Sequence, residues 1–446
     1  MVLGLLVGIL FFGFLITPTH AELTLDTSLS VSEQYTDNLF FTFANKREDF
    51  GTFIIPRTTL VFENKHIKLG GTYAASAQLY VNNSQANTVA HGMNLILDLP
   101  FLNRISKRLE IRVNESFNLT PNQPGFSGAS SVFTSAAGVT GGGGASGLAA
   151  GGGVALAGTG GAGVGGIGGI GGLSGNSLNN QGIFTQRRTT TFQNRARILV
   201  DYNLSPRWDS NIQYSNTLRG GLQNSITHVV RSFLSYNVSD RTKINGGYSF
   251  RAIDYSAGGG AGTTSTSSQA PGNNGTSTTH SLNLGTNYQL QPTIPIIANV
   301  AVSVTKTEIS TTRLNFTGYG EISKQFSDGS IGLRANQGIG SGGGIAASST
   351  LNQNVVFTAQ KSLTRMLNAF LQMGYSRNRS LGGIAINLDS YQARGGVNLT
   401  ILKWLSGGVT YSYVNQESTG QFGSTAQRNQ IFVGLTATPE TFSLFD

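Results

Sequence analysis

Residue types suited to catalysis are few and scattered along this chain of 446 residues. It has no cysteine, which excludes thiolate nucleophiles, disulfides and cysteine-ligated metals. Among its five histidines, His228 stands near Ser225 and Thr227, but in an extended strand those hydroxyls project from the opposite face. A histidine without a nucleophile or carboxylate beside it lacks the pairing that hydrolytic catalysis needs. We therefore predict that the chain is not an enzyme and has no catalytic residue.

Motifs for metals and cofactors are equally weak. One predicted loop, 37–50, carries the aromatic residues Phe40, Phe41 and Phe43 and the carboxylates Asp37, Glu48 and Asp49. We favour a solvated loop with an aromatic belt over a calcium site there. Residues 161–166 match the dinucleotide pattern GxGxxG, but they lie inside a glycine run with no strand before them and no helix after. We predict no metal and no cofactor.

Arginine, by contrast, recurs at strand spacing. On the polar phase of the predicted strands, arginines outnumber carboxylates about two to one. Fixed guanidinium groups along one wall raise the local anion concentration and lower the barrier to anion passage. The alternative is pairing with carboxylates across strands, which would cancel much of that field. The arginines predicted to line an anion path are Arg57, Arg112, Arg195, Arg197, Arg231, Arg251, Arg334 and Arg394.

Strands with two chemically distinct faces would bring these arginines to one side. In residues 195–215, apolar side chains such as Ile198 and Tyr202 alternate with polar ones such as Arg197 and Asp201. A period of two over about 9–14 residues is typical of a tilted strand that crosses a bilayer. The recurrence of this pattern predicts about 16–18 strands, with 18 favoured. Their ranges are 23–36, 51–64, 66–81, 88–99, 106–120, 187–203, 207–219, 224–237, 240–255, 278–290, 294–308, 312–325, 329–339, 349–361, 365–379, 388–401, 404–417 and 427–438.

The composition agrees with such strands. Only 11% of residues are charged and 39% are hydrophobic, while glycine alone accounts for 60 residues. A polar but mostly uncharged chain suits a barrel that is apolar on one face only. Disorder fits poorly, because valine, isoleucine, tyrosine and phenylalanine recur in regular runs. The net charge of +9 does not indicate nucleic-acid binding, because the basic residues are dispersed rather than clustered.

The N-terminus has the form of an export signal. Residues 1–17 are an apolar run, and Thr19-His20-Ala21 follows as a small-x-small cleavage site. We predict Sec-type cleavage near Ala21, although no lysine or arginine precedes the run. A membrane anchor is the alternative. No later stretch offers about 18 consecutive apolar residues, so closed strands would have to span the membrane.

The connections alternate between two kinds. Tight ones, such as Ser205-Pro206-Arg207, separate longer glycine-rich ones, of which 121–186 is the longest. Outer-membrane barrels place short turns in the periplasm and long loops outside the cell. We therefore predict an all-β fold: a signal peptide (1–21) and a transmembrane antiparallel β-barrel (22–446), with 121–186 as an external loop.

Residues 29–120, and more loosely most of the mature chain, carry motifs of a known family. They are an E-x-Y-x-D-N element, a D-x-x-x-x-x-x-P strand and a tyrosine-containing strand, matched by Glu33, Tyr35, Asp37, Asn38, Asp49, Pro56, Tyr73 and Tyr80. The chain thereby resembles the bacterial outer-membrane β-barrel proteins found with exopolysaccharide and PEP-CTERM gene clusters. The resemblance implies an outer-membrane barrel serving polysaccharide export, and the family has no agreed catalytic residues to carry over. This chain departs from the family in its long 121–186 loop and in its final aromatic, Phe445, one place before the end.

We predict a porin-like channel in the Gram-negative outer membrane, with an electropositive lumen for passive diffusion or export of anionic solutes. Exopolysaccharide is one candidate cargo. The alternative is a structural or adhesive surface barrel with a plugged interior and no transport role. The expected partners are outer-membrane lipid, lipopolysaccharide, polysaccharide and export-system components, but no nucleic acid. The sequence names neither the transported molecule nor the oligomeric state.

Overall fold

The computed structural model describes residues 22–122, 189–220, 223–257, 275–307, 312–340, 350–380, 386–420 and 423–445. The predicted signal peptide lies outside these residues. So does the predicted loop 121–186, apart from Pro121 and Asn122, which end a strand. Among the described helices, none has the length and apolar character required to cross a membrane.

The described residues form eighteen long strands, one short strand and two single-turn helices. Every predicted strand is present, with its ends displaced by a few residues. The elements are β1 (Glu22–Thr36), β2 (Asp49–Glu63), β3 (Lys68–Tyr80), η1 (Ser84–Ala86), β4 (Thr88–Asp98), α2 (Leu102–Ile105), β5 (Leu109–Asn122), β6 (Thr189–Ser205), β7 (Trp208–Gly220), β8 (Gln223–Ser239), β9 (Thr242–Ala257), β10 (Gly275–Gln291), β11 (Ile294–Thr307), β12 (Arg313–Phe326), β13 (Gly329–Gly340), β14 (Thr350–Ser362), β15 (Leu367–Ser380), β16 (Ile386–Leu402), β17 (Leu405–Gly420), β18 (Ser424–Ala437) and β19 (Phe442–Phe445).

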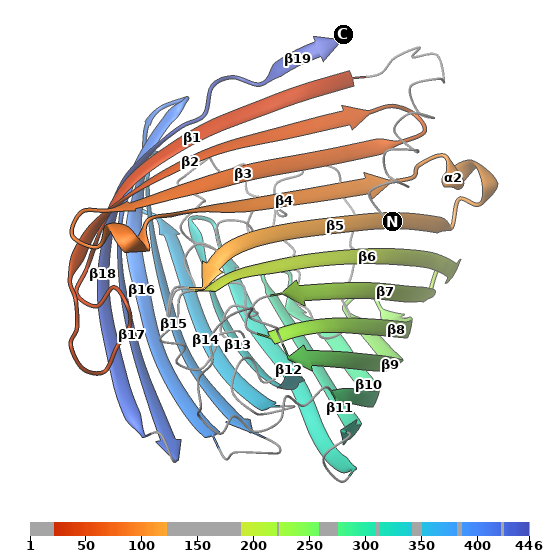
Figure 1. Cartoon of the computed structure of the whole chain (residues 1–446). Helices are drawn as coiled ribbons and strands as arrows, with labels where there is room; N and C mark the ends of the chain where they lie inside the picture. The colour runs from red at the N-terminus through yellow and green to blue at the C-terminus, as the bar shows by residue number, and fades with distance from the viewer. Residues whose placement is uncertain are drawn as a thin grey trace.

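The strands close into one antiparallel barrel (Figure 1). Each pairs with its neighbours in the chain, and β1 closes the ring by pairing with β18, from Leu29 opposite Ala437 onward. The last predicted strand, 427–438, ends at Ala437, and the chain returns to the ladder as β19, where Phe445 lies opposite Leu23. Pro439 stands in the break, where it has no N–H to donate to a ladder. The fold is therefore a closed 18-strand antiparallel β-barrel whose last strand is interrupted.

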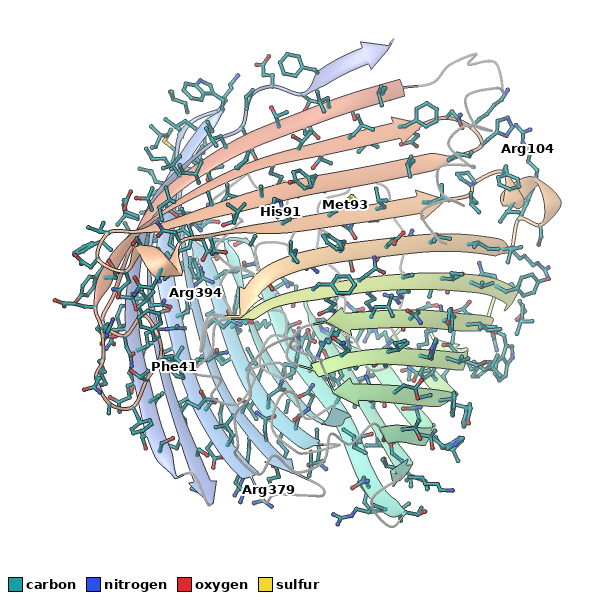
Figure 2. All side chains as sticks on the ribbon, in the orientation of Figure 1. Phe41, His91, Met93, Arg104, Arg379 and Arg394 are labelled. Atoms are coloured by element: carbon teal, nitrogen blue, oxygen red, sulfur yellow. The ribbon has the colours of Figure 1, made fainter. Side chains whose placement is uncertain are left out.

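Alternation gives the barrel two different faces. On β8, Val230 and Leu234 are exposed on the outside, whereas Phe233 and Ser235 are buried inside. Figure 2 shows the same outward placement for labelled Met93 on β4. The outer face is largely apolar, because successive side chains of a strand point to opposite sides and one side of each strand is apolar in sequence.

The two ends of the barrel differ in their connections. We call the end that joins β2 to β3, β6 to β7 and β8 to β9 the turn end, and the opposite end the loop end. At the turn end, the Ser205 hydroxyl accepts hydrogen bonds from the N–H groups of Arg207 (3.3 Å) and Trp208 (3.2 Å). The Ser239 hydroxyl accepts one from Arg241 N–H at 3.3 Å. These local bonds satisfy backbone donors without a long loop, which explains how so few residues reverse the chain.

Candidate functional site

The eight predicted arginines lie on the inner face by strand alternation. On β6, Arg195 and Arg197 alternate with Ala196 and Ile198, and the Ile198 side chain is exposed on the outer face. On β8, Arg231 follows the exposed Val230. The same alternation places the others inside: Arg57, Arg112, Arg251, Arg334 and Arg394. Their role in anion passage stays a prediction.

Arg112 and Arg334 form ion pairs with carboxylates. The Arg112 Nε lies 2.6 Å from Asp98 Oδ1, and its Nη2 lies 3.1 Å from Glu110 Oε1. The Arg334 Nε lies 3.3 Å from Glu321 Oε2. Ion pairs of this kind tie neighbouring strands together and remove much of the field that an isolated guanidinium would project. Arg112 and Arg334 therefore contribute little to a positive lumen.

Four arginines gather on β6 to β9, although up to 56 residues separate them in sequence (195 to 251). The strand ladder sets Arg197 opposite Ser215, Ser215 opposite Val229, and Val229 opposite Arg251. These residues thus form one row across four adjacent strands. Arg195 lies one inward position away from Arg197 along β6. We call Arg195, Arg197, Arg231 and Arg251 the arginine cluster.

Like charges act on one another within the arginine cluster. The charges of Arg251, Arg195 and Arg197 all reach the Arg231 guanidinium. Among the described residues, no carboxylate lies within 4.0 Å of a guanidinium nitrogen of Arg195 or Arg197. Repulsion between like charges is unfavourable, and an anion close to Arg195 and Arg197 would relieve it.

Hydrogen bonds to neutral groups orient the cluster. The Arg197 Nη2 donates to Gln213 Oε1 at 2.9 Å, and Gln213 is buried beside it on β7. The Arg251 Nη1 donates to the backbone carbonyl of Ile339 on β13 at 2.9 Å. An amide or carbonyl acceptor fixes a guanidinium in place without cancelling its charge. The two hydrogen bonds therefore fix the orientation of the Arg197 and Arg251 guanidinium groups.

Arg57 and Arg394 stand apart from the cluster on other strands. The charge of Asp26 on neighbouring β1 acts on Arg57. Arg394 is buried on β16, with its guanidinium 5.7 Å from the centre of the Phe370 ring. Its Nε and Nη2 have no hydrogen-bond partner among the described residues. The two arginines therefore lie on the inner face outside β6 to β9 and do not belong to the arginine cluster.

The first loop differs from its prediction. Residues 37–48 do not form a wholly solvated loop, because Leu39 and Phe41 are only 2% and 3% exposed. Leu39 packs with Phe53 and Tyr80, which lie among the buried, inward positions of β2 and β3. The Phe41 ring lies 5.1 Å from the Arg428 guanidinium on β18. Part of the loop therefore folds inward onto the barrel wall, although Phe43 remains exposed.

Specific hydrogen bonds hold this loop against β18. The Asp37 carboxylate accepts from the backbone N–H of Asn429 at 2.8 Å and from its side-chain amide at 2.6 Å. The Asn38 amide donates to the carbonyls of Thr42 (2.7 Å) and Gln427 (2.8 Å). Phe41 adopts a left-handed backbone conformation with φ of 50°, which a bulky residue seldom takes without compensating contacts.

The carboxylates proposed as an alternative calcium site have structural roles instead. Asp49 is fully buried and accepts hydrogen bonds from Phe50 N–H (2.8 Å), Asn82 N–H (3.0 Å) and the Asn83 amide (2.6 Å). Glu48 accepts from the Tyr35 hydroxyl at 2.9 Å. Within the described ranges, no group of three or more histidines, cysteines or carboxylates could hold a metal ion.

Three histidines lie on the outer face, each beside a tyrosine of the adjacent strand. The Nδ1 atoms of His91, His228 and His280 lie 2.8, 3.0 and 2.6 Å from the hydroxyls of Tyr73, Tyr214 and Tyr248. This repeated pairing satisfies polar groups within an otherwise apolar surface. It provides each of the three histidines with a hydrogen-bond partner on the adjacent strand.

Sequence reasoning did not assign Arg428, whose guanidinium is buried against the loop. The strand pattern could have revealed it, because Arg428 lies on the opposite face of β18 from the exposed side chains of Ile431 and Val433. Lys243 was also missed. It forms an ion pair with Asp209 on β7.

No protein-family model matches the chain. No curated protein matches it either. Solved structures similar to it include the FrpB iron transporter from Neisseria meningitidis, at 7% identity and a TM-score of 0.44, over 93% of this chain and 81% of that one. OpdQ from Pseudomonas aeruginosa is similar at 8% identity and a TM-score of 0.43, over 95% of this chain and 98% of that one. At these scores the similarities carry no argument, and the assignment to the closed antiparallel β-barrels rests on the strand ladder itself.

Proposed function

We propose that the chain is a porin-like channel of the Gram-negative outer membrane through which anionic solutes diffuse passively. The arginine cluster is the observation that carries this proposal. It places four guanidinium groups on one inner wall, and among the described residues Arg195 and Arg197 have no ion-pair partner. A barrel of about 16–18 strands is wide enough to enclose an aqueous path. The guanidinium groups would lower the barrier for anions along that path.

The location in the outer membrane is part of the same proposal. Apolar side chains occupy the outer face of strand after strand, and such a face is stable against hydrocarbon. The predicted signal at 1–21 would provide export, and cleavage near Ala21 would leave a chain that begins where β1 begins.

Acidic exopolysaccharide is our proposed cargo within the class of anions. The resemblance of residues 29–120 to barrels found with exopolysaccharide gene clusters supports it. Under this proposal, export-system components deliver the polymer to the barrel. A linear polymer of uronic acids, added to one side of a conducting bilayer, is expected to interrupt the current. An equally long neutral glucan serves as the control.

Planar-bilayer recording of the purified chain tests the channel. Stable, anion-selective steps are expected. The double substitution Arg195→Glu with Arg197→Glu should move the reversal potential toward cation selectivity, because it reverses the charge on one wall. A double variant with the same charge change, Arg365→Glu with Arg379→Glu, alters exposed positions outside the cluster and should change the reversal potential much less. Equal shifts in both variants would remove the cluster from the mechanism.

A structural or adhesive barrel with a plugged interior is the second candidate. The inward fold of residues 37–48 favours it, because Leu39 and Phe41 occupy space inside the wall. Under this alternative, correctly folded protein gives no conductance at any voltage. The same recording therefore separates the two functions.

A further inference from the structure

The turn end carries an excess of positive charge. All of its connections lie within the described residues, and their charged side chains are exposed. The basic ones are Lys65, Arg104, Lys107, Arg108, Arg207, Arg241, Arg365 and Lys403. The acidic ones are Asp240, Asp328 and Glu440. The connections therefore hold eight cations against three carboxylates, and we call the eight the basic turn residues.

These cations are not neutralised by the chain itself. Within the described part, none of the eight has a nitrogen within 4.0 Å of a carboxylate. Asp328 is the one carboxylate of these connections that forms an ion pair, and its partner is Lys361 at 3.5 Å. Arg108 donates through Nη1 to the Leu204 carbonyl at 3.1 Å, which leaves its charge uncompensated. A surface of this kind attracts anionic groups from outside the chain.

One connection is much longer than the others and contains α2 (Figures 1 and 2). Its Phe101 N–H donates to the His66 carbonyl of the neighbouring turn at 3.2 Å. Desolvation, and then the charges of Arg104 and Lys65, lower the pKa of His66, so the cations of the two connections lie close together. The hydrogen bond from Phe101 therefore ties the long connection to the turn between β2 and β3.

The basic turn residues also adjoin aromatic residues. Arg207 precedes Trp208, and Lys403 precedes Trp404. Both tryptophans are exposed, and they are the only two in the chain. Trp208 packs against Tyr236, with ring centres 4.7 Å apart. Tryptophan and tyrosine prefer the level of the lipid headgroups, so the basic residue directly before each tryptophan lies at that level too.

We infer that the turn end binds the headgroups of anionic phospholipids, with the basic turn residues contacting phosphate and the adjoining aromatic residues lying at the boundary of the acyl chains. This inference rests on the membrane location in the proposed function and adds a lipid class to it. Lysine and arginine near an anionic leaflet each gain attraction to it, and salt screens that attraction. Zwitterionic headgroups offer no net charge and would be depleted around this end.

The two tryptophans allow a direct test, because both report from the proposed contact. The full chain is folded into vesicles of phosphatidylcholine with one-fifth phosphatidylglycerol. Brominated acyl chains, which quench tryptophan on contact, are placed on the anionic lipid in one sample and on an equal share of the zwitterionic lipid in the other. We expect quenching by the brominated anionic lipid to be about twofold stronger or more at low salt. High salt should remove the difference in tryptophan quenching between the two samples.

Variants locate the effect. Replacing Arg207, Arg241, Arg365 and Lys403 by glutamine should reduce the quenching ratio toward one. A control that replaces Lys46, Arg47, Arg313 and Arg379 by glutamine removes as many cations from outside the turn end and should keep the ratio of the wild type. Equal quenching by the two lipids in the wild type would overturn the inference while leaving the channel intact. Absence of quenching by either lipid would mean that the barrel does not insert, and the proposed membrane location would fail as well.

Discussion

Asp49 provides the sharpest test of what the family-like motif does in this chain. Its carboxylate is fully buried and accepts three hydrogen bonds, of which those from Asn82 N–H and the Asn83 amide tie β2 to the connection after β3. Hydrogen bonds to a charged group each contribute about 1.5–3 kcal/mol. The bond from Phe50 N–H is local and can be replaced by water, so we count only the other two. Asp49→Ala should therefore lower the free energy of unfolding by about 3–6 kcal/mol.

Urea unfolding of the barrel in lipid vesicles, followed by tryptophan fluorescence, measures this change. Asp49→Asn keeps one acceptor oxygen but sets an amide against the Asn83 amide, so it should lose about half as much. The control is Asp328→Ala, which removes an exposed carboxylate 3.5 Å from Lys361 and should cost under about 0.5 kcal/mol. Equal midpoints for Asp49→Ala and the control would show that Asp49 does not hold β2 against the connection after β3.

Two further substitution pairs follow from packing. A Cβ at Gly247 would lie 2.2 Å from Cδ1 of Phe233, so Gly247→Ala should destabilise the barrel by about 1–3 kcal/mol, whereas Gly246→Ala, which meets nothing within 4 Å, should change the urea midpoint little. Phe41→Ala should lower the free energy of unfolding by about 3 kcal/mol, because the ring is buried inside the wall. Phe43→Ala should lower it by under about 0.5 kcal/mol, because that ring is exposed. Comparable losses of stability in thermal melts of the two variants would contradict the inward fold of the loop.

The faces of the strands were predictable because alternation is local. Ile198 and Val230 lie on the outer face, as their positions in the apolar phase predict. A register shift of one residue would turn every polar side chain of a strand to the apolar outer face, so each strand's own pattern specifies which of its faces points outward. The short turns were predictable for a similar reason. Ser205 caps its turn through bonds to residues two and three places ahead.

The loop was not predictable in the same way. Its aromatic residues and carboxylates are compatible with a solvated loop, and the sequence of residues 37–48 does not indicate which distant residues they contact. Asn38 bonds to the Gln427 carbonyl and Phe41 lies over Arg428, at the far end of the chain. Those contacts exist only because β1 and β18 pair to close the barrel.

The sequence by itself determined the strands, their inner and outer faces and the kind of turn between them, because each depends on residues within one strand or hairpin. The tertiary structure alone decided which charges meet. Arg112 is neutralised by Asp98 on the next strand, while Arg197 and Arg251 share a row of the ladder across four strands. Whether a guanidinium is paired or left to attract an anion depends on register and closure, which are properties of the whole barrel.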